Sequence, residues 1–199
     1  RPMGLSRGTY GIKLQDRLSQ IIQEPFAILQ SHDPQFYNAL LTITQSPNIK
    51  YFKRTHFFVP TYYSNMGPFC KLLFLFIINN KLPQDHNIAI FLSGKSNLIK
   101  NYLQELFTDE IYKDIVTTVR QVALIQAQGD AITLYPLNPK GTRSIQVFAG
   151  FRLSDAGFDA AFNAASFIAG VSGDNTFERT VSTKLLPFYW STNENLKKK

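Results

Sequence analysis

The sequence predicts an α/β fold in which helices cover both faces of a parallel sheet. The chain has 199 residues, of which 44% are hydrophobic and 18% are charged, so it can bury a sizeable core. From residue 87 onward, short runs of strand-forming residues recur along the chain, and segments of helical periodicity separate them. Strands that alternate with helices in this way are typical of parallel sheets.

The amino-terminal part, residues 1–84, is predicted to be helical and rich in aromatic residues. Helices are expected at residues 14–22, 34–44 and 68–79. Asp33 is expected to cap the second of them, because a proline follows it in the first helical position. Tyr51–Tyr63 is dense in aromatic residues around Pro60 and is predicted to be extended or a loop. The helix at 68–79 is too short for a membrane span, which requires roughly 20 apolar residues.

The carboxyl-terminal part, residues 85–192, carries the alternating pattern, and residues 193–199 are predicted to be a polar tail. Strands are predicted at residues 87–92, 131–135, 144–148, 166–171 and 185–190. Helices are predicted at residues 98–106, 109–126, 154–165 and 174–183. Ser154 is expected to cap the third of these helices. Pro187 predicts that the last strand lies at an edge of the sheet.

The loops that follow the predicted strands are candidate binding loops, because ligands of parallel α/β sheets bind beyond the carboxyl ends of the strands. These loops are Ser93–Asn97, Pro136–Thr142, Gly150–Ser154 and Ser172–Thr176.

The most informative loop joins a predicted strand to a predicted helix. Its residues are Ser172, Gly173, Asp174, Asn175 and Thr176, and Glu178 follows within the helix. Small residues let a ligand approach the backbone, and the free N–H groups of a helix start bind phosphate or diphosphate. Asp174 or Glu178 would accept hydrogen bonds from ribose or sugar hydroxyl groups. The same residue types also serve as ordinary helix caps, and composition does not separate the two interpretations.

Two runs in this region resemble a known protein family. They are Gly173–Phe177 and Leu186–Trp190, both within the segment Ser166–Trp190. This segment resembles the carboxyl-terminal, nucleotide-sugar-binding half of GT-B-fold glycosyltransferases, with a likeness to the protein-arginine rhamnosyltransferases. In that family a Gly-acid-acid-Ser-Phe run begins the helix, whereas here Asn175 stands in place of the second acid.

The resemblance implies a Rossmann-like parallel sheet of GT-B type and the transfer of a sugar from a nucleotide-sugar donor to an acceptor, for which a protein is one option. It also implies that Asp174, Asn175 and Thr176 contact the donor. The amino-terminal catalytic Asp of the family has no recognised counterpart here, so no catalytic residue is assigned. Because GT-B enzymes contain two such halves, residues 1–84 are expected to belong to an incomplete first half.

Cations near the predicted strand ends are candidates for binding the donor's phosphate groups. Gly94 and Lys95 lie in a polar turn after the strand at 87–92, although this turn lacks the Gly-x4-Gly-Lys frame of a P-loop. Arg152 follows the strand at 144–148. Because no Asp-x-Asp metal signature occurs, Lys95 or Arg152 is expected to balance the charge of the leaving diphosphate without a metal ion. No metal site and no cofactor besides the donor substrate is predicted.

The net charge of +7 raises nucleic acid as a partner, but three of the basic residues form the terminal run Lys197–Lys199. Lys50, Lys53 and Arg54 lie beside aromatic residues, as in platforms that bind single-stranded nucleic acid. A folded surface beside a core has the same composition and is the preferred interpretation. A nucleic-acid partner is therefore not predicted.

Cysteine and histidine usage adds little chemistry. The single cysteine, Cys70, excludes an internal disulfide framework and favours a reducing compartment such as the cytoplasm. A signal peptide upstream of Arg1 would instead indicate secretion. The three histidines share no metal-binding spacing, and only His56 is a candidate base.

The abundance of aromatic residues supports a second functional hypothesis. The chain contains 17 Phe and 9 Tyr residues, and those in the amino-terminal part would suit a partner surface. The alternative to a glycosyltransferase is therefore a non-catalytic α/β protein-interaction module.

Overall fold

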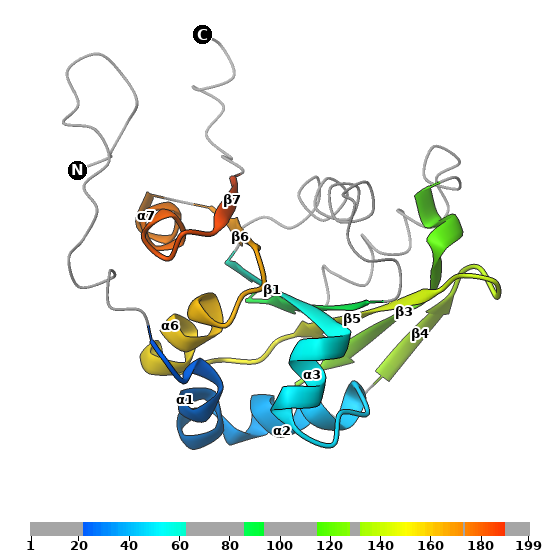
Figure 1. Cartoon of the computed structure of the whole chain (residues 1–199), viewed down its shortest axis with the longest axis horizontal. Coiled ribbons are helices and arrows are strands. Elements are labelled where there is room, and N and C mark those ends of the chain that lie inside the picture. Colours follow the sequence, from blue (N-terminus) through cyan, green and yellow to red (C-terminus); the bar gives the residue numbers. More distant parts are fainter. Residues whose placement is uncertain (1–21, 63–85, 94–114, 128–131, 173, 190–199) are drawn as a thin grey trace, which may run out of the picture.

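The computed structural model describes residues 22–62, 86–93, 115–127, 132–172 and 174–189. Within these residues the chain forms a seven-stranded sheet with the order β4-β3-β5-β2-β1-β6-β7 (Figure 1). Neighbouring strands are parallel, except that β3 and β4 are antiparallel. The predicted α/β class with a largely parallel sheet is thus confirmed.

The bounds of the elements are as follows. The strands are β1 His56–Tyr62, β2 Asn87–Leu92, β3 Val119–Gln126, β4 Ile132–Pro136, β5 Arg143–Ala149, β6 Ile168–Val171 and β7 Leu186–Tyr189. The helices are α1 Pro25–His32, α2 Pro34–Ile43, α3 Ile49–Thr55, α6 Asp155–Asn163 and α7 Asp174–Ser182, with a 3-10 turn at Ile115–Thr118.

Most of the predicted elements within the described residues are confirmed. Strands β2, β4, β5, β6 and β7 lie where short apolar runs predicted them, and β7 is an edge strand, as Pro187 indicated. Helices α2, α6 and α7 match predicted helices as well. The prediction of an extended segment or loop at Tyr51–Tyr63 is confirmed for β1 and is wrong for residues 51–55, which belong to α3, a helix that Asn48 caps. The helices predicted at 14–22, 68–79 and 98–106 lie outside the described residues.

The prediction of a helix over residues 109–126 is wrong for its second half, which forms β3. Val119 and Val122 are spaced as on one helix face, which suggested the helix. The segment is nevertheless rich in β-branched residues, and most of its side chains are buried whichever face of the strand they occupy. Because β3 has β5 on one side and β4 on the other, its backbone is hydrogen-bonded in the sheet.

Strand β1 belongs to the predicted amino-terminal part, yet it lies inside the sheet. It pairs with β2 along its length and with β6 at Thr61 and Tyr62. Pro60 has no N–H group to donate. The pairing of β1 with β6 therefore begins only at Thr61, the residue after it. The sheet therefore continues across the predicted boundary between residues 84 and 85.

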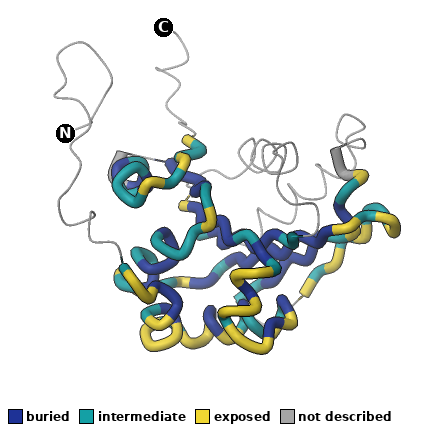
Figure 2. The backbone as a smooth tube through the Cα atoms, in the orientation of Figure 1, coloured by how far each residue is buried: buried dark blue, intermediate teal, exposed yellow. Residues whose placement is uncertain are grey.

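One face of the sheet is covered by the helices that the structure describes, and the core there is aromatic. Helices α1, α2 and α6 lie against this face (Figure 1), and Figure 2 shows their outward sides exposed while the central strands are largely buried. Phe36 of α2 packs its ring against four others, those of Phe58, Phe91, Phe148 and Phe151, at centroid distances of 5.1–6.3 Å. Aromatic side chains thus join the helices to the middle of the sheet.

Asp33 has a different role from the predicted one. It precedes α2, but its side chain makes no cap hydrogen bond to that helix. Its carboxylate instead accepts hydrogen bonds from the backbone N–H of Ser154, at 2.9 Å, and from the Ser154 hydroxyl, at 2.8 Å. Ser154 in turn caps α6, as predicted, by accepting from the N–H of Gly157 at 3.0 Å. Asp33 therefore links the start of α2 to the start of α6.

Replacing Gly157 with alanine is expected to destabilise the protein by roughly 1–2 kcal/mol, because the new Cβ would contact the Asp33 carboxylate and displace it from Ser154. In an Asp33→Ala background the same change should be neutral or stabilising, since alanine favours helices over glycine by about 1 kcal/mol. Urea unfolding of the four proteins of this double-mutant cycle measures both effects. If Gly157→Ala changed stability equally in the two backgrounds, the cost would not come from displacing Asp33.

Candidate functional site

The candidate site lies at the carboxyl ends of β1 and β6 and is defined by the sheet topology. These strands are neighbours, but the chain continues from β1 to β2 on one side and from β6 to β7 on the other. Neighbouring parallel strands whose connections leave in opposite directions form a topological switch point, where open α/β sheets bind ligands. The segment Ser172–Glu178, which the sequence singled out, follows β6 at this point.

Hydrogen bonds hold the ends of β1 and β6 together. The backbone N–H of Ser172 donates to the carbonyl of Tyr62 at 3.0 Å, and its hydroxyl donates to the same oxygen at 3.3 Å. On the other side of β1, the N–H of Ser93 donates to the carbonyl of Thr61 at 3.3 Å. Three strand ends therefore lie at one edge in a defined geometry.

Helix α7, which begins just after this edge, carries a set of buried polar side chains along its length. They are Thr176, Glu178 and Thr180. Thr180 donates its hydroxyl to the carbonyl of Thr176 at 2.8 Å. Glu178 is only 2% exposed, and its Oε1 atom has no hydrogen-bond partner within the described residues. A buried carboxyl oxygen without a partner is costly and calls for an explanation, of which a bound ligand is one.

An ion pair and a cation–π contact fasten α7 to α6. Arg179 lies 2.9 Å from the Asp159 carboxylate and places its guanidinium 5.0 Å from the centre of the Phe158 ring. Burial raises the pKa of Asp159; Arg179 opposes this rise in pKa, and Asp155 adds to it. Because α6 is itself joined to α2 through Asp33, the last turn of α7, which carries Arg179, is tied to a connected helical layer.

The structure brings together only part of the predicted site. Ser172, Thr176 and Glu178 lie on the turn and helix that follow β6. Asp174 and Asn175 form the first turn of α7, with only their backbone described, and Gly173 lies outside the described residues. Gly94 and Lys95 of the second candidate loop also lie outside them. Their expected roles stay predictions.

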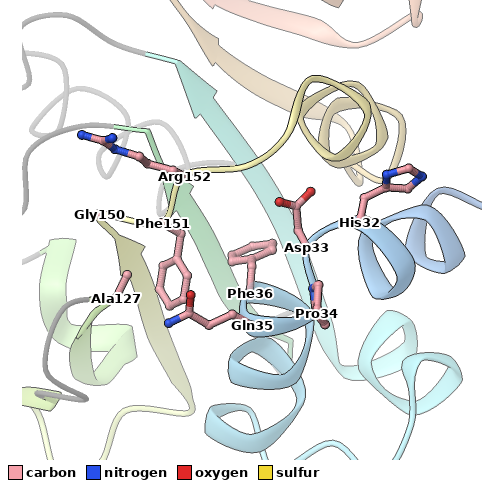
Figure 3. Close-up of a pocket in the computed structure, with 9 residues that line it drawn as sticks. All are labelled: His32, Asp33, Pro34, Gln35, Phe36, Ala127, Gly150, Phe151 and Arg152. Carbon is pink, nitrogen blue, oxygen red and sulfur yellow. The ribbon is translucent and has the colours of Figure 1, made fainter.

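Arg152 does not lie beside the other predicted residues. It follows β5, which is three strand positions from β6, or about 14 Å at roughly 4.8 Å per strand. It lines an open pocket of about 390 Å³ at the ends of β3 and β5, together with the first residues of α2. Figure 3 shows the rings of Phe36 and Phe151 at the centre of this pocket, whereas the Arg152 and His32 side chains point away from it.

The loop Pro136–Thr142 is at the wrong edge of the sheet to take part. Because β4 runs antiparallel to β3, Pro136 pairs with Gln121 near the start of β3. This loop therefore lies at the amino edge, opposite the switch point, and the expectation that it is a binding loop is wrong. The sequence does not predict the hairpin between β3 and β4, because the residues of β3 have the spacing of a helix.

His56 also lies at the amino edge, at the start of β1. It is buried, stacks on Phe52 with ring centres 5.0 Å apart, and shares a hydrogen bond between its Nδ1 and the Thr55 hydroxyl at 2.9 Å. Burial, with a smaller contribution from the charge of His86, lowers the pKa of His56 to about 4. This placement gives no support to His56 as a base at the switch point.

Of the three aromatic residues beside the cations around α3, two are packed inside the protein, and the third, Tyr51, is exposed. Phe52 is in the core and Phe57 packs against Phe167, so neither ring is free to stack on a nucleotide base. Lys53 places its ammonium group 5.2 Å from the centre of the Phe26 ring. The preferred interpretation, a folded surface beside a core, agrees with this arrangement.

Comparison with protein-family models, curated proteins and solved structures finds no match to this chain. Among the described residues, no group of three or more His, Cys, Asp or Glu side chains is placed to hold a metal ion. No helix in that part of the chain is both long and apolar enough to cross a membrane.

Proposed function

We propose that the switch point at the ends of β1 and β6 binds a nucleotide-sugar, and that the chain is a glycosyltransferase or the donor-binding half of one. The observation that carries the proposal is the position of Ser172–Glu178. This segment, which the sequence singled out for binding phosphate and hydroxyl groups, follows β6 at a switch point of the sheet. Buried Glu178, with its unpartnered oxygen, supports it further.

The order of the five strands from β5 to β7 supports a Rossmann-like interpretation. Their order β5-β2-β1-β6-β7 corresponds to the order 3-2-1-4-5 of dinucleotide-binding folds, with β3 and β4 added at one edge. The Gly-x-Gly-x-x-Gly fingerprint of those folds does not follow β1, where the sequence is Tyr63–Pro68. Phosphate binding is therefore assigned to the start of α7 and not to the loop after β1.

Each residue of this segment has a role in the proposal. The backbone N–H groups at the start of α7, with Asn175 and Thr176, bind the diphosphate, and the small residues Ser172 and Gly173 leave room for it. Glu178 or Asp174 accepts hydrogen bonds from the hydroxyl groups of the ribose or the sugar. Lys95 keeps its predicted role at the diphosphate. Arg152, which follows β5 three strand positions from β6, is assigned to a more distant part of the substrates.

The chemistry of the proposal is a group transfer. A nucleophile of the acceptor forms a bond to the anomeric carbon of the sugar, and the bond between that carbon and the diphosphate oxygen breaks. The diphosphate leaves with the electron pair, and positive groups around it stabilise the charge. The proton of the acceptor goes to a base that is not assigned.

Binding of the donor tests the proposal directly. The protein is titrated with UDP-, GDP- and dTDP-sugars, with and without Mg²⁺, and thermal stability and calorimetric affinity are measured. At least one nucleotide should raise the midpoint of unfolding. Thr176→Ala and Asp174→Ala should weaken that effect, whereas Thr183→Ala, at the far end of α7, is the matched control. If no nucleotide binds, or if binding is unchanged in the first two variants, the proposal fails.

Glu178→Gln separates a ligand-binding role from a structural one. The change keeps the size of the side chain and removes a buried charge, so the unliganded protein should be as stable as the original or more so. Affinity for the bound nucleotide-sugar should fall about 10-fold or more, because a charged acceptor is lost. Thermal unfolding with and without ligand measures both. A less stable variant with unchanged affinity would show that Glu178 is structural.

Several of the residues that suggest the alternative, a protein-interaction module, lie in the core, although Tyr51 and Tyr62 are exposed. The aromatic residues that suggested a partner surface include Phe26, Phe36, Phe52 and Phe58. All four are buried in the core against the sheet.

A further inference from the structure

Tyr62, the last residue of β1, has surroundings that the proposed donor site alone does not explain. Its carbonyl accepts both hydrogen bonds from Ser172, so its backbone is fixed at the switch point. Its side chain is 45% exposed, which is unusual for a large aromatic residue in a strand flanked on both sides. Part of the ring surface is therefore open to solvent near the switch point.

The Tyr62 ring is also held in place. It packs against Phe158 of α6 with ring centres 5.7 Å apart and the planes at 82°, an edge-to-face contact. Phe158 is itself covered by the Arg179 guanidinium, which is paired with Asp159. An edge-to-face contact of this kind fixes the orientation of a ring and leaves part of its surface accessible.

We propose that Tyr62 is the platform on which the base of the bound nucleotide stacks. This inference rests on the proposed function, because it takes the start of α7 as the site of the diphosphate. Tyr62 pairs with Val171, directly before Ser172, so its ring lies on the strand next to the phosphate-binding turn. A nucleoside diphosphate with its phosphates at α7 reaches the end of β1 with its base.

A second exposed tyrosine provides a matched control. Tyr189 of β7 is 42% exposed and packs edge to face on Phe177, with ring centres 5.5 Å apart and the planes at 80°. It pairs with Val171 from the opposite side. Tyr189 thus has the same ring, similar exposure and a similar contact, but it lies on the far side of β6 from the switch point.

The experiment compares two ligands on four proteins. The original protein, Tyr62→Phe, Tyr62→Leu and Tyr189→Leu are titrated calorimetrically with the best-bound nucleoside diphosphate and with inorganic pyrophosphate. Base stacking on an aromatic side chain contributes about 1–3 kcal/mol, which is roughly a 5- to 150-fold change in affinity. Tyr62→Leu should lose that factor for the nucleotide and little for pyrophosphate, while Tyr62→Phe and Tyr189→Leu stay near the original.

The possible failures are distinguishable. If the original protein binds neither ligand, the proposed function falls and this inference falls with it. If it binds the nucleotide and Tyr62→Leu binds it equally well, only the role of Tyr62 is overturned. If Tyr62→Leu loses affinity equally for the nucleotide and for pyrophosphate, Tyr62 supports the structure at the strand ends and does not stack on the base. Leucine retains an apolar contact to Phe158, and thermal unfolding confirms that each variant is folded.

Discussion

Replacing Phe36 with alanine is expected to lower the free energy of unfolding by about 3–5 kcal/mol, the largest stability effect predicted here. The side chain is 1% exposed, and its ring contacts those of four other phenylalanines from β1, β2, β5 and the turn after β5. Alanine would leave a cavity between α2 and the sheet that rigid aromatic neighbours cannot fill.

Urea unfolding of Phe36→Ala and Phe36→Leu measures this effect, and the leucine variant should lose less because it fills more of the space. Tyr51→Ala on the exposed side of α3 is the control and should change stability by about 0.5 kcal/mol or less. A loss below about 1 kcal/mol for Phe36→Ala would contradict the central place of Phe36 in the core. Domains are commonly stable by about 5–15 kcal/mol, so the variant is expected to be marginal.

Acidification is expected to destabilise the protein through His56, by an amount on the order of 2–3 kcal/mol between pH 7 and pH 4. In the folded state the pKa of His56 is lowered to about 4 from its ordinary 6.5. The unfolded chain therefore takes up a proton as the pH falls below about 6.5, whereas the folded chain does so only near pH 4. The free energy of unfolding therefore falls progressively as the pH drops from about 6.5 to 4. Above pH 6.5 the contribution of His56 to stability no longer changes with pH.

Denaturant unfolding at several pH values between 4 and 7.5 measures the effect. His56→Phe keeps a planar ring against Phe52 and cannot be protonated, so its stability should fall less steeply over the same range. The exposed His32 provides the control, and His32→Asn should retain the original pH dependence. Identical pH dependence in His56→Phe and the original protein would contradict the assignment to His56.

The elements that could be predicted from the sequence are those with a local signal. Strands β2 and β5 are short apolar runs bounded by polar residues, and α6 begins at Ser154 with a cap that the structure retains. The sequence of β3 predicts a helix wrongly, because a buried apolar run fits the spacing of a helix as well as that of a strand. Only its pairing with β4 and β5 makes it a strand.

The contiguous part of the candidate site was likewise open to prediction, since Ser172–Glu178 places small, polar and acidic residues at one helix start. Tyr62 was not, because it lies 110 residues from Ser172 in sequence and meets it only through the pairing of β1 with β6. Asp33 shows the same limit: its local pattern indicates a cap for α2, whereas the fold uses its carboxylate at α6.

The sequence by itself determined the α/β class and the segment to which the proposed site is assigned. Both depend on periodicity and on residue types within a few positions of one another. Only the tertiary structure decided the strand order, the edge at which each loop lies and the neighbours of Ser172. Strand pairing joins residues far apart in the chain, and local propensities do not specify which strands become neighbours.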